Sequence, residues 1–228
     1  GVRVDEGVAV QGLLRQGERV TGVRTARGEV HAGMVVSVQN IWAAELHAWA
    51  GLSLPLHAER HRVLALQGPQ AYTRAMPVFK DLASAGMLYA RSYGGAQMLV
   101  SEGTAGEVLD RPDTTPGPID MDWVLEVGAQ VAARFPSFAD AGLASSWTGV
   151  YDVTPDWNPI LGAVPGLDGL VLGCGFSGHG FKLAPAVGRV LAQVALGLPA
   201  DVDLAPYALQ RFAAGRLLSG RYGRGAVS

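Results

Sequence analysis

The sequence predicts a mixed fold, part α/β and part α+β, in which an incomplete α/β layer accompanies an antiparallel sheet. Two observations predict the α/β layer: the apolar run 34–38 precedes helical spacing over 41–50, and the apolar strand 170–172 precedes a glycine-rich turn and an apolar helix. A third predicts the sheet, because the residues between these units read as short strands and one helix. Such a segment is typical of an antiparallel sheet with helices on one face.

The first forty residues are predicted to be β structure. The predicted strands are 8–14, 19–24, 29–32 and 34–38, with turns at Gly17 and Gly28. The last strand is continuously apolar, which is typical of a strand buried on both faces. The helix predicted over 41–50 ends before Gly51.

The middle of the chain is predicted to be sheet with one helix. The predicted strands are 62–66, 87–91 and 97–101, and the helix is Met121–Phe135, with Asp120 as its N-cap. Residues 102–119, rich in acids, prolines and glycines, are predicted to be a surface loop.

The last third returns to α/β character. The strand 170–172 is followed by glycines and by a helix predicted over 183–196, which Gly197 and Pro199 end. The residues after 215 are predicted to be a frayed tail. The predicted organisation is a partial first domain at 1–52, a β-sheet domain at 53–148, a return to the first domain at 149–215 and a tail at 216–228.

Composition excludes several classes of protein. Hydrophobic residues make up 49% of the chain, charged residues 17%, and the net charge is −2. Disordered chains have low hydrophobicity and high net charge, and binders of nucleic acid or anionic membranes are usually basic. No apolar run approaches the ~20 residues of a membrane-spanning helix. We therefore expect no nucleic-acid or membrane partner.

The single cysteine and the histidines do not indicate a metal site. Cys174 is the one cysteine, so an intrachain disulfide and a cysteine zinc cage are both impossible, and a reducing, cytoplasmic setting is expected. His57 and His61 have the i, i+4 spacing of helical metal ligands, but they fall beside a predicted strand and no third ligand is evident.

The most informative segment is 173–182, Gly-Cys-Gly-Phe-Ser-Gly-His-Gly-Phe-Lys. It contains GxGxxG between a strand and a helix, but the further strand and acidic residue of a dinucleotide site do not follow. Two other interpretations remain open. The glycines could let the backbone approach a flat ligand at the positive helix end, or they could serve only the packing of a tight turn.

Lys182 favours the functional interpretation. The chain has only two lysines, Lys80 and Lys182, and an ammonium at a helix N-terminus is unfavourable for the helix itself. An anionic substrate group would explain it. The alternative is a lysine that extends to solvent.

A second motif is Thr154-Pro155-Asp156 through Gly162. Here we expect Asp156 to bond its own backbone rather than act as an acid.

These two motifs together resemble the D-amino-acid oxidase family of flavoenzymes, in particular the branch of sarcosine oxidase and dimethylglycine dehydrogenase. The matching segments are 151–162, 169–182, and Ala184-Pro185 with Gly188. Weaker similarity covers nearly the whole chain, including Tyr89-x-Arg91.

The resemblance implies FAD as cofactor and assigns residues to it. It implies that the turn lines the flavin ring, with backbone N–H groups near its carbonyls, that Lys182 holds the substrate carboxylate, and that Arg91 could face a ligand. Adenine-side contacts would fall near Val10. The implied cofactor-binding residues are Val10, Gly175, Phe176, Ser177, Gly178, His179, Gly180, Phe181 and Lys182.

The sequence departs from the family pattern at four places. The strand–GxGxxG–helix unit that holds the FAD pyrophosphate is missing before Val35. Gly149 stands where monomeric sarcosine oxidases carry a flavin-linking cysteine, which implies non-covalent FAD. Tyr151 stands where glycine and D-amino-acid oxidases carry a carboxylate-binding arginine, which favours N-methyl or secondary amines. The usual glycine after the buried strand is replaced around Asn40.

The resulting hypothesis is an FAD-dependent oxidoreductase, or a C-terminal fragment of one, that oxidises a secondary or tertiary amine such as an N-methyl glycine by hydride transfer to flavin. The expected partners are a small carboxylate-bearing amine and either oxygen or an electron-transfer acceptor. The first alternative is an inactive remnant, or a subunit that completes a partner's flavin site. A module that binds carboxylates without redox chemistry is the third hypothesis.

Overall fold

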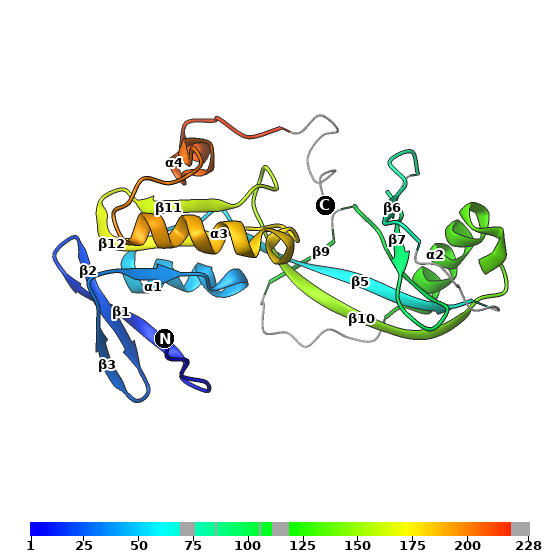
Figure 1. Ribbon diagram of the computed structural model, residues 1–228, viewed down its shortest axis with the longest axis horizontal. Helices are drawn as coiled ribbons and strands as arrows, with labels where there is room; N and C mark the ends of the chain where they lie inside the picture. The colour runs from blue at the N-terminus through cyan, green and yellow to red at the C-terminus, as the bar shows by residue number, and fades with distance from the viewer. Residues whose placement is uncertain (69–75, 85, 105, 111–118, 220–228) are drawn as a thin grey trace. The chain divides into compact units, whose positions relative to one another are not determined.

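The computed structural model describes residues 1–68, 76–84, 86–104, 106–110 and 119–219 (Figure 1). The described residues form two compact units. The first comprises Gly1–His57 with Asp152–Ser219, and the second comprises Ala58–Tyr151.

The first unit is built around a six-stranded sheet. Its strands are β1 (Val10–Gln16), β2 (Arg19–Thr25), β3 (Gly28–His31), β4 (Val35–Ser37), β11 (Ile160–Val164) and β12 (Leu167–Cys174). The order is β1-β2-β12-β11, with β3 paired to β2 and β4 paired to β12. The β4–β12 pair is parallel, with Val35 opposite Leu170, whereas β11 and β12 are antiparallel. This parallel pair is the α/β layer that the sequence predicts.

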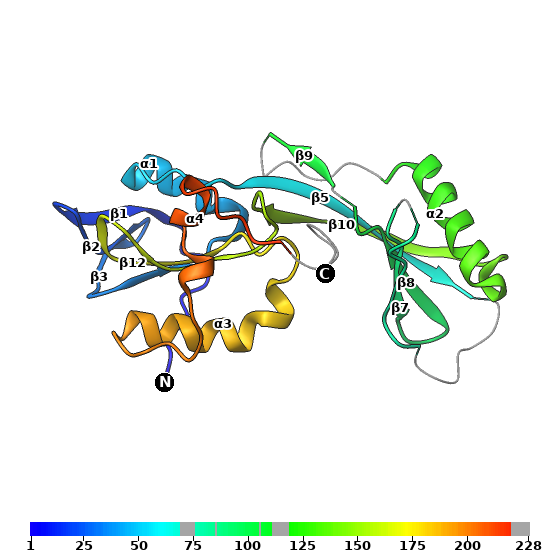
Figure 2. The same ribbon diagram turned by 90° about the horizontal axis from the view of Figure 1, so that it is seen from above.

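Helices cover both faces of this sheet. These are the 3-10 helix η1 (Asn40–Glu45), the short α1 (Leu46–Ala50) and the long α3 (Gly180–Ala195), followed by η3 (Ala205–Tyr207) and α4 (Gln210–Ala213). Leu46 of α1 packs with Leu170 and Leu172, and Leu191 of α3 packs with Val171. Since successive strand residues point to opposite faces, α1 and α3 lie on opposite sides of β12 (Figure 2).

Two local predictions in this unit need correction. In the run 34–38 only Ser37 is buried, while Val36 and Val38 are exposed, because within the described residues β4 pairs with β12 alone. The first half of the helix predicted over 41–50 is a 3-10 helix, although α1 does end at Gly51, in the left-handed conformation with φ +69°. Asn40 has φ +54°, a left-handed conformation that asparagine adopts more readily than most residues.

The second unit contains the antiparallel sheet. Its strands are β5 (His57–Gln67), β6 (Phe79–Lys80), β7 (Tyr89–Ser92), β8 (Gln97–Ser101), β9 (Glu107–Leu109) and β10 (Gly142–Val153). The order is β10-β5-β8-β7-β6, with β9 paired to β5. The helix α2 (Met121–Arg134) packs on one face, and η2 (Pro136–Phe138) follows it. Here Val127 and Val131 of α2 pack with Leu64 and Val100 of the sheet.

The predicted helix cap is confirmed, and the predicted loop is wrong in one part. The carboxylate of Asp120 accepts a hydrogen bond from the Asp122 N–H at 3.0 Å. Within 102–119, residues 107–109 form β9, since they pair with β5; residues 111–118 lie outside the described residues. The predicted tail is described only as far as 219. Among the described residues, no helix is long and apolar enough to cross a membrane.

Candidate functional site

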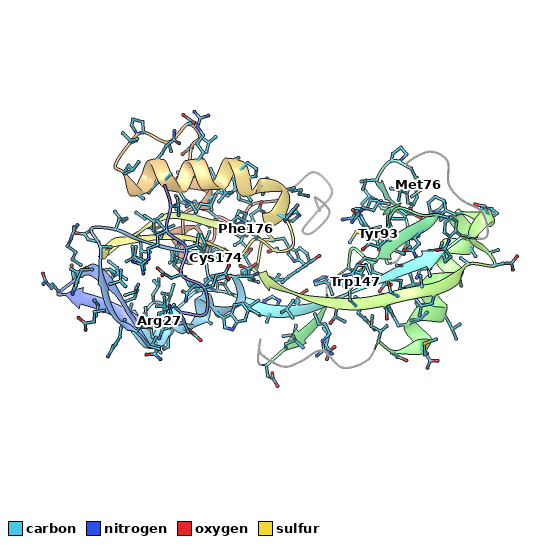
Figure 3. The ribbon with its side chains drawn as sticks, turned by 60° about the horizontal axis from the view of Figure 1, so that its bottom comes forward. Arg27, Met76, Tyr93, Trp147, Cys174 and Phe176 are labelled. Atoms are coloured by element: carbon cyan, nitrogen blue, oxygen red, sulfur yellow. The ribbon has the colours of Figure 1, made fainter. Side chains whose placement is uncertain are left out.

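The turn singled out in the sequence joins the end of β12 to the start of α3. The strand ends at Cys174, and α3 begins at Gly180, three residues earlier than the helix predicted from 183. Between them the backbone takes positive φ at Gly175 (+71°), Ser177 (+49°) and Gly178 (+84°). Three of the four residues 175–178 are therefore left-handed, which reverses the chain within a few residues. Figure 3 labels Cys174 and Phe176, the neighbours of Gly175.

Asp152, near the end of β10, fixes this turn through hydrogen bonds. Its carboxylate accepts hydrogen bonds from the N–H groups of Gly175 (2.5 Å) and Phe176 (3.2 Å), and its carbonyl accepts one from Ser177 N–H (3.1 Å). The side chain is buried, and this burial raises the pKa of Asp152 even though the backbone N–H groups act in the opposite direction. The sequence analysis did not single out Asp152 as a site residue.

Ser177 and Thr154 tie the same turn to the second motif. The Ser177 hydroxyl accepts a hydrogen bond from Thr154 N–H at 3.2 Å and donates one to the Gly175 carbonyl at 3.3 Å. Both side chains are fully buried. A β-carbon on Gly175 would lie 2.4 Å from the Thr154 methyl group. Glycine is therefore required at 175 by packing, in agreement with the simpler of the two interpretations of this turn.

His179 is also a structural member of the turn. Its ring is buried, with Nδ1 3.0 Å from the carbonyl oxygen of Phe176, and its backbone N–H donates to the same carbonyl at 2.8 Å. The imidazole therefore fixes the position of Phe176 and the start of α3.

The remaining N–H groups of the turn are open. Among the described residues, no acceptor is found for the N–H groups of Gly178 and Gly180, and no side chain caps the N-terminus of α3. The Phe181 side chain is 98% exposed and Lys182 beside it is exposed. A helix N-terminus with open N–H groups attracts negative charge. These residues fit a flat ligand with electron-rich carbonyl groups, such as the flavin implied by the sequence.

The second motif contains a fully buried ion pair. Asp156 accepts a hydrogen bond from Asn158 N–H at 3.2 Å, so the predicted bond to its own backbone is confirmed. Arg211 of α4 also binds it in bidentate fashion, Nε to Oδ2 at 2.8 Å and Nη2 to Oδ1 at 2.9 Å. The Leu218 N–H donates to the same carboxylate. This pair attaches the C-terminal segment to the first unit and was not anticipated from sequence.

The other predicted residues are on other elements than the turn. Val10 is the first residue of β1. Arg91 lies on β7, in the second unit, whereas the turn and Lys182 belong to the first. His57 and His61 both lie on β5, so the helical spacing that would have joined them as metal ligands is absent. Among the described residues, no group of three side chains could hold a metal ion.

Residues 1–194 match the protein family described as FAD dependent oxidoreductase, and the chain belongs to this family. The family expected from the two motifs is thereby confirmed. A glycine oxidase of Pseudomonas aeruginosa is 32% identical over 91% of this chain and 54% of its own length. A sarcosine oxidase subunit beta of an Arthrobacter species is 30% identical over 100% of this chain and 54% of its own length.

Solved structures give the same assignment. The L-proline dehydrogenase from P. horikoshii has a TM-score of 0.81 and 28% identity, covering 92% of this chain and 55% of its own. The iminodiacetate oxidase from Chelativorans sp. has a TM-score of 0.73 and 26% identity, covering 86% of this chain and 51% of its own. The chain thus spans about half the length of the relatives it matches.

Proposed function

We propose that this chain supplies the flavin-contacting turn and the substrate-binding sheet of an FAD-dependent oxidoreductase that oxidises a secondary or tertiary amine such as an N-methyl glycine. The observation that carries the proposal is the turn itself, whose other N–H groups donate to Asp152 and to the Phe176 carbonyl, while those of Gly178 and Gly180 stay open at the start of α3. The relatives named above are all oxidases or dehydrogenases, which favours this function over an inactive remnant.

The cofactor, when bound, supplies the hydride acceptor. The chain's own residues supply orientation and electrostatics. The open N–H groups of Gly178 and Gly180, with the positive end of α3, stabilise negative charge at this position. Lys182 holds the substrate carboxylate, which orients the carbon next to nitrogen. Asp152, Ser177 and His179 keep the turn in the conformation that presents these N–H groups.

We further propose that FAD is held without a covalent bond. Gly149 stands at the position of the flavin-linking cysteine that the family pattern offers. Cys174 lies beside the turn but is fully buried, and burial, with the nearby Asp152 charge, raises the pKa of its thiol to about 12. A thiol is a nucleophile only as the thiolate, so Cys174 is an unsuitable attachment point. Acid precipitation would release the flavin if this is correct.

Oxygen or an electron-transfer acceptor would reoxidise the flavin. A partner subunit is part of the same proposal, since one relative is named as the beta subunit of a sarcosine oxidase.

The visible absorption spectrum of the purified chain, recorded before and after incubation with FAD and gel filtration, tests the proposal. The expected result is a retained flavin band that bleaches anaerobically when sarcosine or dimethylglycine is added. Retained flavin that no amine bleaches would contradict the proposed reaction. A chain that retains no flavin, even together with a strand–GxGxxG–helix unit supplied in trans, would contradict the proposed cofactor site.

A further inference from the structure

The sheet of the second unit has two chemically different faces. Strand residues alternate between them, so Leu64 and Ala90, which pack in the core beneath α2, define one face. Tyr89 and Arg91, on either side of Ala90, and His61 of β5 belong to the opposite face. That opposite face combines these polar and aromatic side chains with the aliphatic Leu99, the cross-strand partner of Arg91, and Ala65, the partner of Leu99.

Aromatic rings meet on this opposite face. The rings of His61 and Tyr151 are stacked, with centroids 4.1 Å apart. The rings of Tyr93 and Trp147 are 6.1 Å apart and tilted by 47° (Figure 3). Tyr93 is 45% exposed and Trp147 is 39% exposed. Two large rings that contact each other and still expose this much surface can offer their faces to a planar group.

Arg91 places a positive charge beside these rings. Its guanidinium carbon lies 5.8 Å from the centre of the Tyr93 ring, and Nη1 donates to the Ser92 carbonyl at 3.2 Å. Within the described residues, no carboxylate forms an ion pair with Arg91. By contrast, Arg60, Arg134 and Arg211 each pair with a carboxylate. A half-buried guanidinium with most of its five N–H donors available is suited to bind a carboxylate in bidentate fashion.

We propose that Arg91, Tyr93 and Trp147 form a specificity subsite for a carboxylate carried on a planar, apolar arm of the substrate. The guanidinium selects a negative charge, and the rings select the planar group next to it. The same charge disfavours a cationic arm. This inference rests on the proposed function and deepens it, since among secondary and tertiary amines it favours those that carry a planar, acidic arm.

Binding of benzoate to the full chain, measured by calorimetry, tests the subsite without any need for flavin. Benzoate combines the carboxylate and the planar ring, and benzamide is its uncharged analogue. We expect saturable benzoate binding that Arg91→Met weakens about tenfold or more, because a charge-assisted hydrogen bond contributes about 1.5–3 kcal/mol. Benzamide should bind more weakly, and its affinity should not change in Arg91→Met. Tyr93→Leu should weaken both ligands.

Arg62→Met is the matched control, because Arg62 also lies over an aromatic ring, that of Trp123 at 4.5 Å. It should leave benzoate affinity unchanged. Absence of saturable benzoate binding, or equal losses in the Arg91 and Arg62 variants, would overturn the subsite. Benzoate binding that follows this pattern in a chain without amine-oxidising activity would support the subsite while contradicting the proposed function, so the two failures are distinguishable.

Discussion

Asp152 shows how one buried side chain can set the chemistry of a backbone segment. Its carboxylate and carbonyl occupy three N–H groups of the turn, those of Gly175, Phe176 and Ser177. The donors left over are therefore those nearest α3. Since burial raises the pKa of Asp152 in the folded protein, its ionisation weakens folding as the pH rises.

The pH dependence of stability tests this assignment in Asp152→Asn. A raised folded pKa means that the Asp152 contribution is fully present below its ordinary pKa of about 3.9 and is lost as the pH rises through the folded value. Asparagine cannot ionise. The free energy of unfolding of the native chain, measured in urea relative to the variant, should therefore fall as the pH rises above about 4. A difference that stays flat or rises would contradict the assignment, and exposed Asp168→Asn is the control.

Lys182 is tested separately from the turn. In flavin-loaded protein, Lys182→Met should raise the apparent KM for a carboxylate-bearing amine by about tenfold or more, because a charge-assisted contact is lost. Flavin content should not change. Lys80→Met, which alters the only other lysine, should leave KM unaffected. Unchanged kinetics in the Lys182 variant would remove its assigned role.

At the scale of the element, the β12–α3 turn depends on a glycine with no room for a side chain. Gly175 combines φ +71° with a space that a β-carbon would fill to within 2.4 Å of Thr154. Gly197, which follows α3, has φ +68° and nothing within 4 Å of the same position. A side chain at Gly197 would therefore meet backbone strain alone, whereas a side chain at Gly175 would meet the same strain and a steric overlap.

Urea unfolding of two alanine variants tests that difference. Gly197→Ala should destabilise the chain by about 1–2 kcal/mol, the energy of a left-handed alanine. Gly175→Ala adds overpacking of about 1–3 kcal/mol and should be clearly less stable. Equal losses in the two variants would show that the turn relaxes around the added methyl group.

At the scale of the whole molecule, the Asp156–Arg211 pair joins segments 55 residues apart in sequence. The two side chains are at most 1% exposed. Burial alone would raise the pKa of Asp156, but the hydrogen bonds from Arg211 hold it below its ordinary value. The pair thus attaches the C-terminal segment to the first unit and stays charged when folded.

Removal of one partner from a buried pair leaves an unpaired charge, which costs about 3–5 kcal/mol. Arg211→Met should lower the free energy of unfolding by that amount in urea titrations. Arg189→Met breaks the exposed pair with Asp201 and should lower it by about 0–1 kcal/mol. Similar small losses in both variants would show that the C-terminal segment contributes little to folding.

Much of the architecture could be predicted from local pattern. The strands at 19–24 and 97–101, the helix capped by Asp120 and the strand–turn–helix around Gly175 all have sequence signals that depend on neighbouring residues. Strands β10 and β11 were not predicted, since the first half of β10 is exposed and lacks apolar alternation. β9 was missed because its pairing with β5 depends on a partner about fifty residues away.

The sequence by itself determined the family, the position of the turn and the presence of Lys182 at the start of its helix, because these depend on residue types at fixed spacing. Only the tertiary structure decided which N–H groups of the turn remain open, that Asp152 occupies the others, and that Arg211 neutralises Asp156. Each of these depends on contacts between residues far apart in the chain, and burial then sets their energies. Local sequence carries no signal for either the partner or the burial.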